Sequence, residues 1–219
     1  ASSHVDRSID YPMEFVMDNV VGTCNILNFA RDQQNLSRFI YFSTDEVFGP
    51  APEGISCAER DRYNSTNPYS ATKAGAEELC VSYENSYGMP IYITHTMNVF
   101  GNRQHPEKYI PSTIRKVRDG KLVTIHSDAT KLTAGSRHYI HTSDVSEAIL
   151  FLLKLSDQGH VFNTDFGDAK CPKFNLTGKE EVDNLELARR IARAVGEELK
   201  YEMIDYHSAR PGHDLRYAI

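Results

Sequence analysis

The stretch Arg38-Phe-Ile-Tyr-Phe-Ser-Thr-Asp-Glu-Val-Phe-Gly49 joins a short apolar run to a polar turn. Consecutive aromatic and β-branched residues are typical of a strand that is buried on both faces of a parallel sheet. The residues that follow, from 43 to 67, contain the glycines and prolines that mark a loop. The stretch therefore predicts a buried strand that ends in a polar loop.

Helical patterns lie on both sides of this strand. Before it, apolar residues recur with the period of a helix from Met13 to Arg31, and Pro12 suits the first helical position. After it, a helix is predicted from Pro68 to about Tyr87, followed by a strand at Ile91–Thr94. Helices that alternate with apolar strands predict an α/β fold with a parallel sheet and crossover helices.

The second half of the chain predicts shorter elements and a smaller mixed α/β region. Helices are predicted at 111–118, 142–155 and 185–195, and strands at 122–125, 137–141, 161–163 and 200–204. We expect Thr142 to cap its helix. The polar segment 165–184 is predicted to be a loop.

The composition is that of a folded protein with no basic surface. Hydrophobic residues make up 40% and charged residues 25%, and a net charge of -6 argues against a general nucleic-acid binder. No apolar run approaches the roughly 18 residues of a membrane-spanning helix. The cysteines at 24, 57, 80 and 171 form no CxxC pair. We therefore expect reduced thiols in a cytoplasmic protein rather than a zinc or redox site.

The start of the chain and its glycines are informative. The chain opens with Ala-Ser-Ser-His-Val-Asp, which is neither an initiator methionine nor a signal peptide. The 13 glycines include no GxGxxG turn of the kind that binds a dinucleotide. Either the protein is not a dinucleotide enzyme, or the first βαβ unit is missing. We favour the second interpretation and expect a piece of a longer protein, cut at both ends.

The sequence Tyr69-Ser-Ala-Thr-Lys73 places a phenol and an ammonium group one helical turn apart. Positive charge beside a phenol favours its ionised form and lowers its pKa. The pair could then act as a general base toward a sugar or alcohol hydroxyl. Such pairs also occur by chance on solvated helix faces, so this motif alone is a weak signal.

The sequence Ser43-Thr-Asp-Glu46 directly follows the predicted strand. Ligands of open α/β sheets bind outside the carboxyl ends of the strands. A hydroxyl and two carboxylates at this place can supply a hydrogen bond, a general acid and a general base. A solvated turn explains the tetrapeptide alone equally well, but together with Tyr69 and Lys73 it favours an active site.

Five runs of residues occur along the chain in the same order as the motifs of one enzyme family: 3–8, 43–49, 67–73, 106–111 and 210–214. They resemble the extended short-chain dehydrogenase/reductase family, or NAD-dependent epimerase/dehydratase family, and most closely its dTDP-glucose 4,6-dehydratases. The resemblance implies a Rossmann-like doubly wound parallel sheet without its first βαβ unit. It assigns 1–96 to the NAD-binding domain and 97–219 mainly to a nucleotide-sugar-binding domain, with 136–155 returning to the first.

The resemblance also implies a reaction, the NAD-dependent dehydration of a nucleotide-diphosphoglucose. Tyr69 would take the proton of the sugar 4-hydroxyl, Lys73 would lower the pKa of Tyr69 and hold the nicotinamide ribose, and Thr44 would bind the 4-oxygen. Asp45 would protonate the departing 6-hydroxyl, and Glu46 would remove the proton at C5. Related 4-epimerases usually lack both carboxylates, and related decarboxylases usually have Ser in place of Asp.

Further ligand contacts are implied by position in the family. Those for the cofactor are Ser3, Ser43, Tyr69 and Lys73, those for the nucleotide sugar are Asn98, Lys108, Arg137, Asn163, Arg210 and His213, and no metal is implied. The stretch 127–136 is longer than is usual in the family, and His126-Ser127 replaces a Tyr-Gly pair near the base-binding region. The identity of the base, thymine, uracil or another, therefore stays open.

The resemblance implies a homodimer in which the helices Met13–Arg31 and Pro68–Tyr87 pair with their mates in a four-helix bundle. An epimerase or decarboxylase of the same family, or a non-catalytic relative, remains the alternative. We expect the 219 residues alone to bind NAD poorly, because the glycine-rich turn that holds its pyrophosphate is absent.

Overall fold

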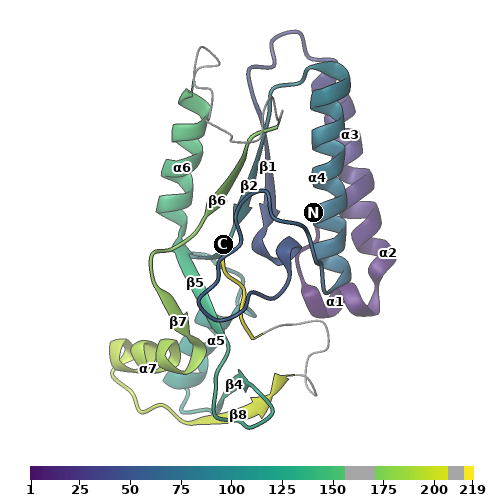
Figure 1. Cartoon of the computed structure of the whole chain (residues 1–219). Helices are drawn as coiled ribbons and strands as arrows, with labels where there is room; N and C mark the ends of the chain where they lie inside the picture. Colours follow the sequence, from purple (N-terminus) through teal and green to yellow (C-terminus); the bar gives the residue numbers. More distant parts are fainter. Residues whose placement is uncertain (156–170, 207–214) are drawn as a thin grey trace.

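A parallel sheet of three strands lies at the centre of Figure 1: β1 (Phe39–Thr44), β2 (Ile91–Thr96) and β6 (Lys173–Leu176). The computed structural model describes residues 1–155, 171–206 and 215–219 of the chain. β2 is the middle strand, and its first five residues are buried, as expected of a strand covered on both faces. The structure confirms the predicted α/β fold with a parallel sheet.

Helix α4 (Pro68–Tyr87) covers one face of this sheet. Asn67 caps its first turn, because the Asn67 side chain accepts a hydrogen bond from the backbone N–H three residues later. Gly88 ends it in the left-handed conformation, with a φ of 66°. The buried core between α4 and the strands includes Tyr41, Ala76, Cys80, Ile91 and Ile93.

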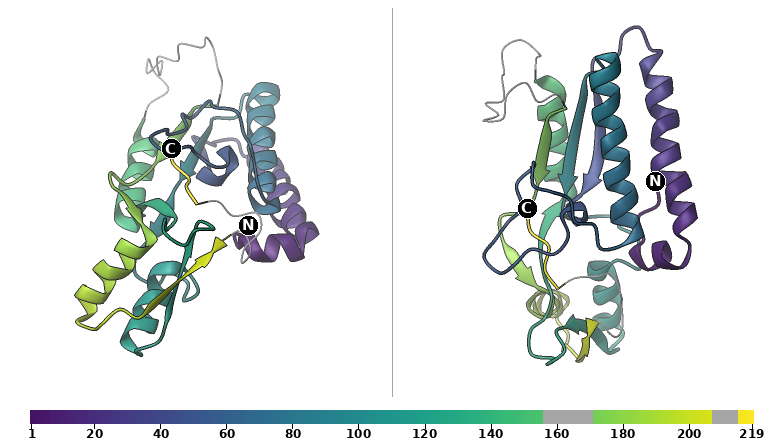
Figure 2. Two further views of the ribbon diagram at one scale, coloured as in Figure 1. Left: turned by 60° about the horizontal axis from the view of Figure 1, so that its bottom comes forward. Right: turned by 45° about the vertical axis from the view of Figure 1, so that its right-hand side comes forward.

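Helix α6 (Thr142–Lys154) lies on the other side of the sheet from α4 (Figures 1 and 2). Its N-cap is His141, one residue before the predicted cap, and the imidazole accepts a hydrogen bond from the backbone N–H of Ser143. Arg38 ties the end of α6 to the sheet. Its guanidinium donates to the carbonyl of Leu155 at 3.0 Å and lies 3.9 Å from the ring centre of Tyr92.

A run of helical turns precedes β1. It consists of α1 (Val5–Asp10), α2 (Pro12–Phe15), the π-helical turn η1 (Val16–Val21) and α3 (Gly22–Arg31). The turns are continuous from residue 12 to residue 31, which confirms the helix predicted there, and α3 lies beside α4 in the right-hand view of Figure 2. Asn19 in η1 is fully buried, and its amide donates to the hydroxyl of Thr72 in α4 at 3.0 Å.

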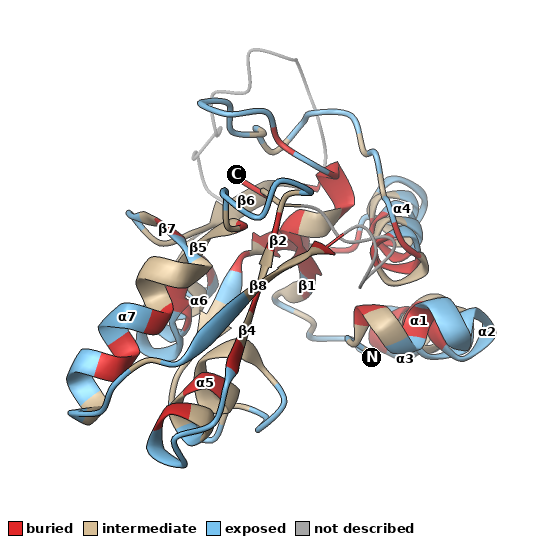
Figure 3. Ribbon diagram, turned by 90° about the horizontal axis from the view of Figure 1, so that it is seen from below, coloured by how far each residue is buried: buried red, intermediate tan, exposed pale blue. Residues whose placement is uncertain are grey.

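A second group of elements lies below this sheet in Figure 1. Its strands are β3 (Asn98–Phe100), β4 (Val123–Ser127), β5 (Ser136–His141), β7 (Glu181–Asp183) and β8 (Tyr201–Asp205), and its helices are α5 (Tyr109–Arg118) and α7 (Asn184–Val195). β5 pairs with β3 in parallel and with β7 antiparallel, while β4 and β8 form a separate parallel pair. Figure 3 shows buried residues on α5, α7 and β4, which share one core.

The predicted loop at 165–184 is wrong in its described part, which contains β6 and β7. The run of β6 is only four residues long, too short for its sequence to show the period of a strand. The segment becomes a strand because it pairs with β2, and this pairing satisfies the backbone hydrogen-bonding groups of both strands. The strand predicted at 161–163 lies outside the described residues.

Residues near the C-terminus hold the loop that follows β1. The guanidinium of Arg216 donates to the carbonyls of Pro52 at 2.5 Å and Ile55 at 2.6 Å, and it forms an ion pair with Glu181 of β7 at 2.7 Å. The backbone of Cys57 adds a bond to the carbonyl of Ala218 at 2.9 Å. One arginine thus joins the loop to the second group of strands.

Apolar side chains are exposed on the outer side of the first helices. Met13 and Phe29 are each 67% exposed and Met17 is 55% exposed. Phe42 in β1 is also 46% exposed. Within the described residues, no helix is long and apolar enough to cross a membrane. All four cysteines are free thiols.

Candidate active site

A cavity of about 350 Å³ opens at the carboxyl ends of β1 and β2, the edge where parallel sheets bind their ligands. The residues predicted to carry chemistry or bind ligands that line it are Ser3, Thr44, Asp45, Glu46, Tyr69, Asn98 and Lys108. They come from the start of the chain, the end of β1, the first turn of α4, β3 and the residue before α5. The fold thus brings distant parts of the chain together around one hollow.

Thr44 and Asp45 mark the point where β1 turns into a 3-10 turn, η2 (Asp45–Phe48). The hydroxyl of Thr44 donates to Asp45 Oδ1 at 3.1 Å and accepts the backbone N–H of Glu46 at 3.4 Å. Asp45 is only 5% exposed, and burial raises the pKa of its carboxyl. The turn therefore aims two adjacent carboxyl groups at the cavity within one turn of backbone.

Glu46 lines the cavity, and its carboxylate accepts a hydrogen bond from one side-chain amide. Asn67, the N-cap of α4, donates to Glu46 Oε2 at 3.1 Å. Burial, and then the neighbouring charge of Asp45, raise the pKa of Glu46 to about 7, while Asn67 opposes the shift. A carboxyl group with this pKa exchanges protons near neutral pH, as a general acid or base must.

Tyr69 stands in the first turn of α4 with its phenol in the same cavity. Its backbone N–H donates to the hydroxyl of Ser8 at 3.1 Å, which links the turn to α1. Burial, followed by the charge of Glu46, raises the pKa of the phenol well above its usual range, and a hydrogen bond with Thr44 partly offsets this. The lowered pKa expected from the sequence is therefore wrong for this chain.

Lys73 explains why that expectation fails. Its ammonium group donates to the carbonyl of Phe42 at 2.6 Å and lies 4.2 Å from the ring centre of Tyr41. Lys73 is 6% exposed, and burial lowers its pKa to about 8, while the charge of Glu77 opposes the shift. The lysine is thus bonded to β1, and the carboxylates beside Tyr69 dominate the charge that the phenol experiences.

Two predicted cationic residues border the carboxylates. Arg137 in β5 donates to the carbonyl of Leu215 at 2.6 Å and lies 4.6 Å from the ring centre of Tyr217. Its charge lowers the pKa of both Asp45 and Glu46, and Lys108 lowers that of Glu46. Both cations therefore lie within electrostatic reach of the cavity.

Among the described residues, Lys73, Arg137 and Ser43 were predicted for the site but do not line this cavity. Ser43 is buried, and its hydroxyl donates to Glu77 in α4. Asn163, Arg210 and His213 lie outside the described residues. Among the described residues, no group of three or more His, Cys, Asp or Glu side chains could hold a metal ion.

Sequence analysis overlooked several residues of the site. Gln104, Tyr109 and Tyr139 also line the cavity. Tyr109 falls within the run 106–111 and directly follows Lys108, so the same motif could have identified it as a site residue. Glu77 lies one helical turn after Lys73, and the i, i+4 spacing could have identified it.

The cavity can perform acid–base chemistry on a polyhydroxylated ligand. A threonine hydroxyl and a tyrosine phenol line it together, and two carboxyl groups with raised pKa values stand beside them. Lys108 and Arg137 add positive charge, which suits a phosphorylated ligand. These are the groups needed to move protons between neighbouring carbon and oxygen atoms.

Several known proteins are similar to this chain in sequence. The NAD dependent epimerase/dehydratase family matches residues 1–164. The low-salt glycan biosynthesis protein Agl12 of Haloferax volcanii is 39% identical over 219 residues, which cover 100% of this chain and 64% of that protein. A trifunctional UDP-glucose 4,6-dehydratase/epimerase/reductase of Arabidopsis thaliana, RHM2, is 36% identical over 219 residues, 99% of this chain and 30% of that protein.

A solved structure shares the fold. The dTDP-glucose 4,6-dehydratase DesIV of Streptomyces venezuelae, crystallised with NAD and TYD, superposes with a TM-score of 0.80 at 32% identity. The match covers 100% of this chain and 62% of that one. The chain thus spans less than two thirds of the length of each of these relatives.

Proposed function

The chain belongs to the NAD dependent epimerase/dehydratase family, and on this premise we propose that the whole protein dehydrates a nucleotide-diphosphoglucose to its 4-keto-6-deoxy form. The observation that carries the proposal is the pair Asp45–Glu46 in one cavity with Thr44 and Tyr69. Oxidation at C4 alone, as in an epimerase, needs a base and a hydrogen-bond donor at one carbon. Two further carboxyl groups fit a reaction that also removes a proton and a hydroxyl.

Each side chain has a role in this proposal. Tyr69 takes the proton of the 4-hydroxyl, and the hydroxyl of Thr44 donates a hydrogen bond to the 4-oxygen. NAD, when bound, supplies the oxidation at C4 and the compensating reduction at C6. Glu46 removes the proton at C5, which the 4-ketone has made acidic, and Asp45 donates a proton to the 6-hydroxyl as it leaves as water. Glu46 returns the proton to C5 when C6 is reduced. The net change is the loss of one water, with no net oxidation.

The donor groups at the carboxyl end of β1 fit the nicotinamide half of NAD. Lys73 offers an ammonium group and Tyr69 a phenol, and both suit the hydroxyls of a ribose. The raised pKa of Tyr69 keeps the phenol protonated in this chain. Its action as a base therefore depends on positive charge beyond that of Lys73, which is already present when the pKa is raised.

Further residues would bind the nucleotide sugar and form the dimer interface. Arg137, Lys108 and Asn98 would bind the diphosphate and sugar, with Asn163, Arg210 and His213 completing that pocket. Residues 1–96 would belong to the NAD-binding domain and 97–219 mainly to the sugar-binding one, with 136–155 returning to the first. The exposed apolar side of α2, η1 and α3 supports a homodimer formed through these helices and α4, which we place in the cytoplasm as part of the proposal.

The test is product analysis with the full-length protein and NAD. We expect dTDP-glucose to yield a product lighter by one water, and UDP-glucose to react more slowly. A product of unchanged mass with inverted configuration at C4 would identify an epimerase instead. Loss of carbon dioxide from UDP-glucuronate would identify a decarboxylase, and no turnover of any of the three would favour a non-catalytic relative.

A further inference from the structure

A buried charge cluster lies behind the candidate active site, centred on Glu77 of α4. Glu77 is fully buried, and its carboxylate accepts hydrogen bonds from Ser43 at the end of β1 and from Tyr63 in the following loop. It also contacts His95 of β2 at 3.1 Å and Lys173 of β6 at 3.3 Å. Burial alone would raise the pKa of Glu77, but the hydrogen bonds from His95, Ser43 and Tyr63 outweigh it and lower the pKa, so Glu77 is ionised near neutral pH.

His95 links this cluster to β6. Its Nδ1 faces Oδ1 of Asn175 at 3.0 Å, and the orientation of that amide is fixed because its Nδ2 donates to the carbonyl of Cys57 at 3.0 Å. Its Nε2 faces the carboxylate of Glu77. Both ring nitrogens thus face side-chain oxygens, and the imidazole joins α4 to β2 and β6.

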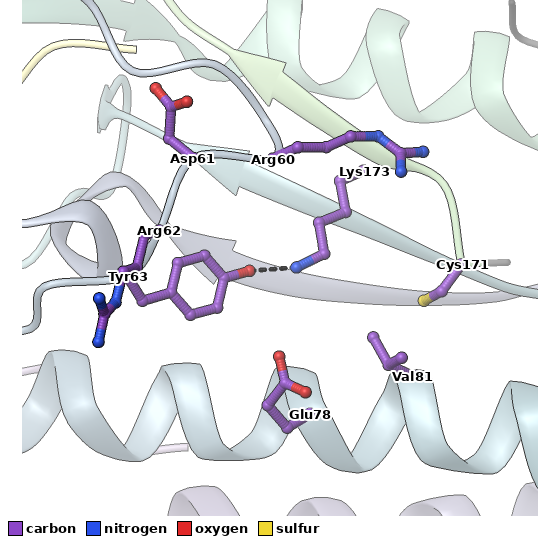
Figure 4. Close-up of a pocket in the computed structure, with 8 residues that line it drawn as sticks. All are labelled: Arg60, Asp61, Arg62, Tyr63, Glu78, Val81, Cys171 and Lys173. Carbon is purple, nitrogen blue, oxygen red and sulfur yellow. Dashed lines mark hydrogen bonds between the residues drawn. The ribbon is translucent and has the colours of Figure 1, made fainter. Parts of the chain in front are cut away.

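The outer end of the cluster reaches a second cavity, of about 490 Å³, shown in Figure 4. There Lys173 donates to the hydroxyl of Tyr63, and both side chains line the cavity. Glu78, the residue next to Glu77, lines this cavity and is exposed. The two neighbouring glutamates therefore face different surroundings, one inside the cluster and one at the surface.

We propose that Glu77 is a positioning residue, which fixes the face of α4 that presents Tyr69 and Lys73 and serves as the buried counter-charge of Lys73. Tyr69, Lys73 and Glu77 recur every four residues, so they share one face of the helix. Contacts from β1, β2, β6 and the loop then set how this face meets the sheet. The effect of Glu77 on catalysis rests on the proposed function, whereas its contacts and its effect on Lys73 do not.

Charge explains the second half of the role. Lys73 is buried against the ring of Tyr41, beside Glu77 and the thiol of Cys80 on its own helix. Burial alone lowers the pKa of Lys73, and Glu77 is the strongest opposing influence. Without this carboxylate, a larger share of Lys73 would be neutral near pH 8 and unable to act as a cation in the site.

The test compares Glu77→Gln, Glu77→Asp and Glu78→Gln in the full-length protein. Competitive labelling of Lys73 with acetic anhydride, followed across pH by mass spectrometry, reports the neutral amine without requiring turnover. We expect the labelling midpoint of Glu77→Gln to move to lower pH, that of Glu77→Asp to stay close to the parent, and that of Glu78→Gln to be unchanged. Loosened packing alone would hydrate Lys73 and move the midpoint to higher pH, so that result would overturn the proposal.

Turnover supplies an independent readout if the protein is active. Misplacement of the α4 face should lower kcat of Glu77→Gln about 100-fold with KM changed less than about threefold, and Glu77→Asp should recover most of the loss. If Glu77→Gln does not fold, Lys173→Gln can be tested in its place, because it removes a positive charge that contacts Glu77 beside the second cavity. The labelling midpoint of Lys73 should then rise, and a fall or no change would contradict the proposal.

Discussion

Glu46 is a carboxyl group held between opposing influences. Burial and the charge of Asp45 favour its protonated form, while the amide of Asn67 and the charges of Arg137 and Lys108 favour the ionised one. The balance leaves the pKa at about 7, so small changes in its surroundings change its charge at neutral pH. The proposed division of labour with Tyr69 can therefore be tested residue by residue.

Glu46→Gln should remove the C5 base and leave the C4 base intact. Loss of a positioned general base costs about 10²–10⁴-fold in rate, so exchange of the C5 proton with heavy water should slow in the full-length variant. The variant should still oxidise dTDP-glucose at C4, because Tyr69 is the base for that step. The reduced cofactor should then be visible by its near-ultraviolet absorbance. Tyr69→Phe should show neither signal, and Glu53→Gln in an exposed loop should behave like the parent. Normal turnover of Glu46→Gln would refute the assignment.

The raised pKa of Glu46 also predicts how the stability of the fold depends on pH. A carboxyl group whose pKa rises on folding stabilises the protein at low pH, and this contribution is lost as pH increases from about 4.5 through about 7. Glu46→Gln should therefore raise the melting temperature of the full-length protein above pH 7 and leave it almost unchanged below pH 4.5. Equal shifts at both pH values would show that burial of this charge is not the cause.

At the scale of elements, α4 shows what short-range sequence signals can specify. Asn67 and Pro68 mark its start and Gly88 its end, and the predicted bounds agree with the structure. β6 carried no such signal, because four residues without a period become a strand only when β2 is beside them. Local signals thus predicted the helices better than the strands whose partners lie far along the chain.

Two glycines of α4 should respond oppositely to alanine. A Cβ at Gly75 would meet only the Val20 side chain at 3.8 Å, so Gly75→Ala should stabilise the helix by about 0.8–1 kcal/mol. Gly88 has a φ of +66° with open space around it, so Gly88→Ala should destabilise by about 1 kcal/mol from backbone strain alone. Denaturant melts of the full-length protein check the signs, and shifts in the same direction would contradict both reasons.

At the scale of the whole molecule, the pocket could be predicted only in part. Thr44, Asp45, Glu46 and Tyr69 were identified because their motifs lie on the elements that meet at the end of β1. The partner of Ser43 and the direction of the Tyr69 pKa could not be foreseen. Both depend on side chains from distant segments and on burial, which a single sequence does not reveal.

The proposed dimer makes its own prediction. The full-length protein should elute as a dimer at micromolar concentration in light scattering, and Phe29→Glu should shift it toward monomer, because a charge would be buried in the apolar interface. Leu132→Glu is the matched control, since Leu132 is 84% exposed on the loop between β4 and β5. A monomeric parent, or equal dissociation of both variants, would argue against an interface at α3.

The bonds of Arg216 to the loop after β1 have a consequence for biosynthesis. This arginine lies 164 positions after Pro52 and 161 after Ile55, so the loop emerges from the ribosome long before its anchor. At about 5–20 residues per second, the nascent chain spends many seconds with this loop synthesised and its anchor not yet made. During translation, β1 and α4 therefore emerge before that support exists.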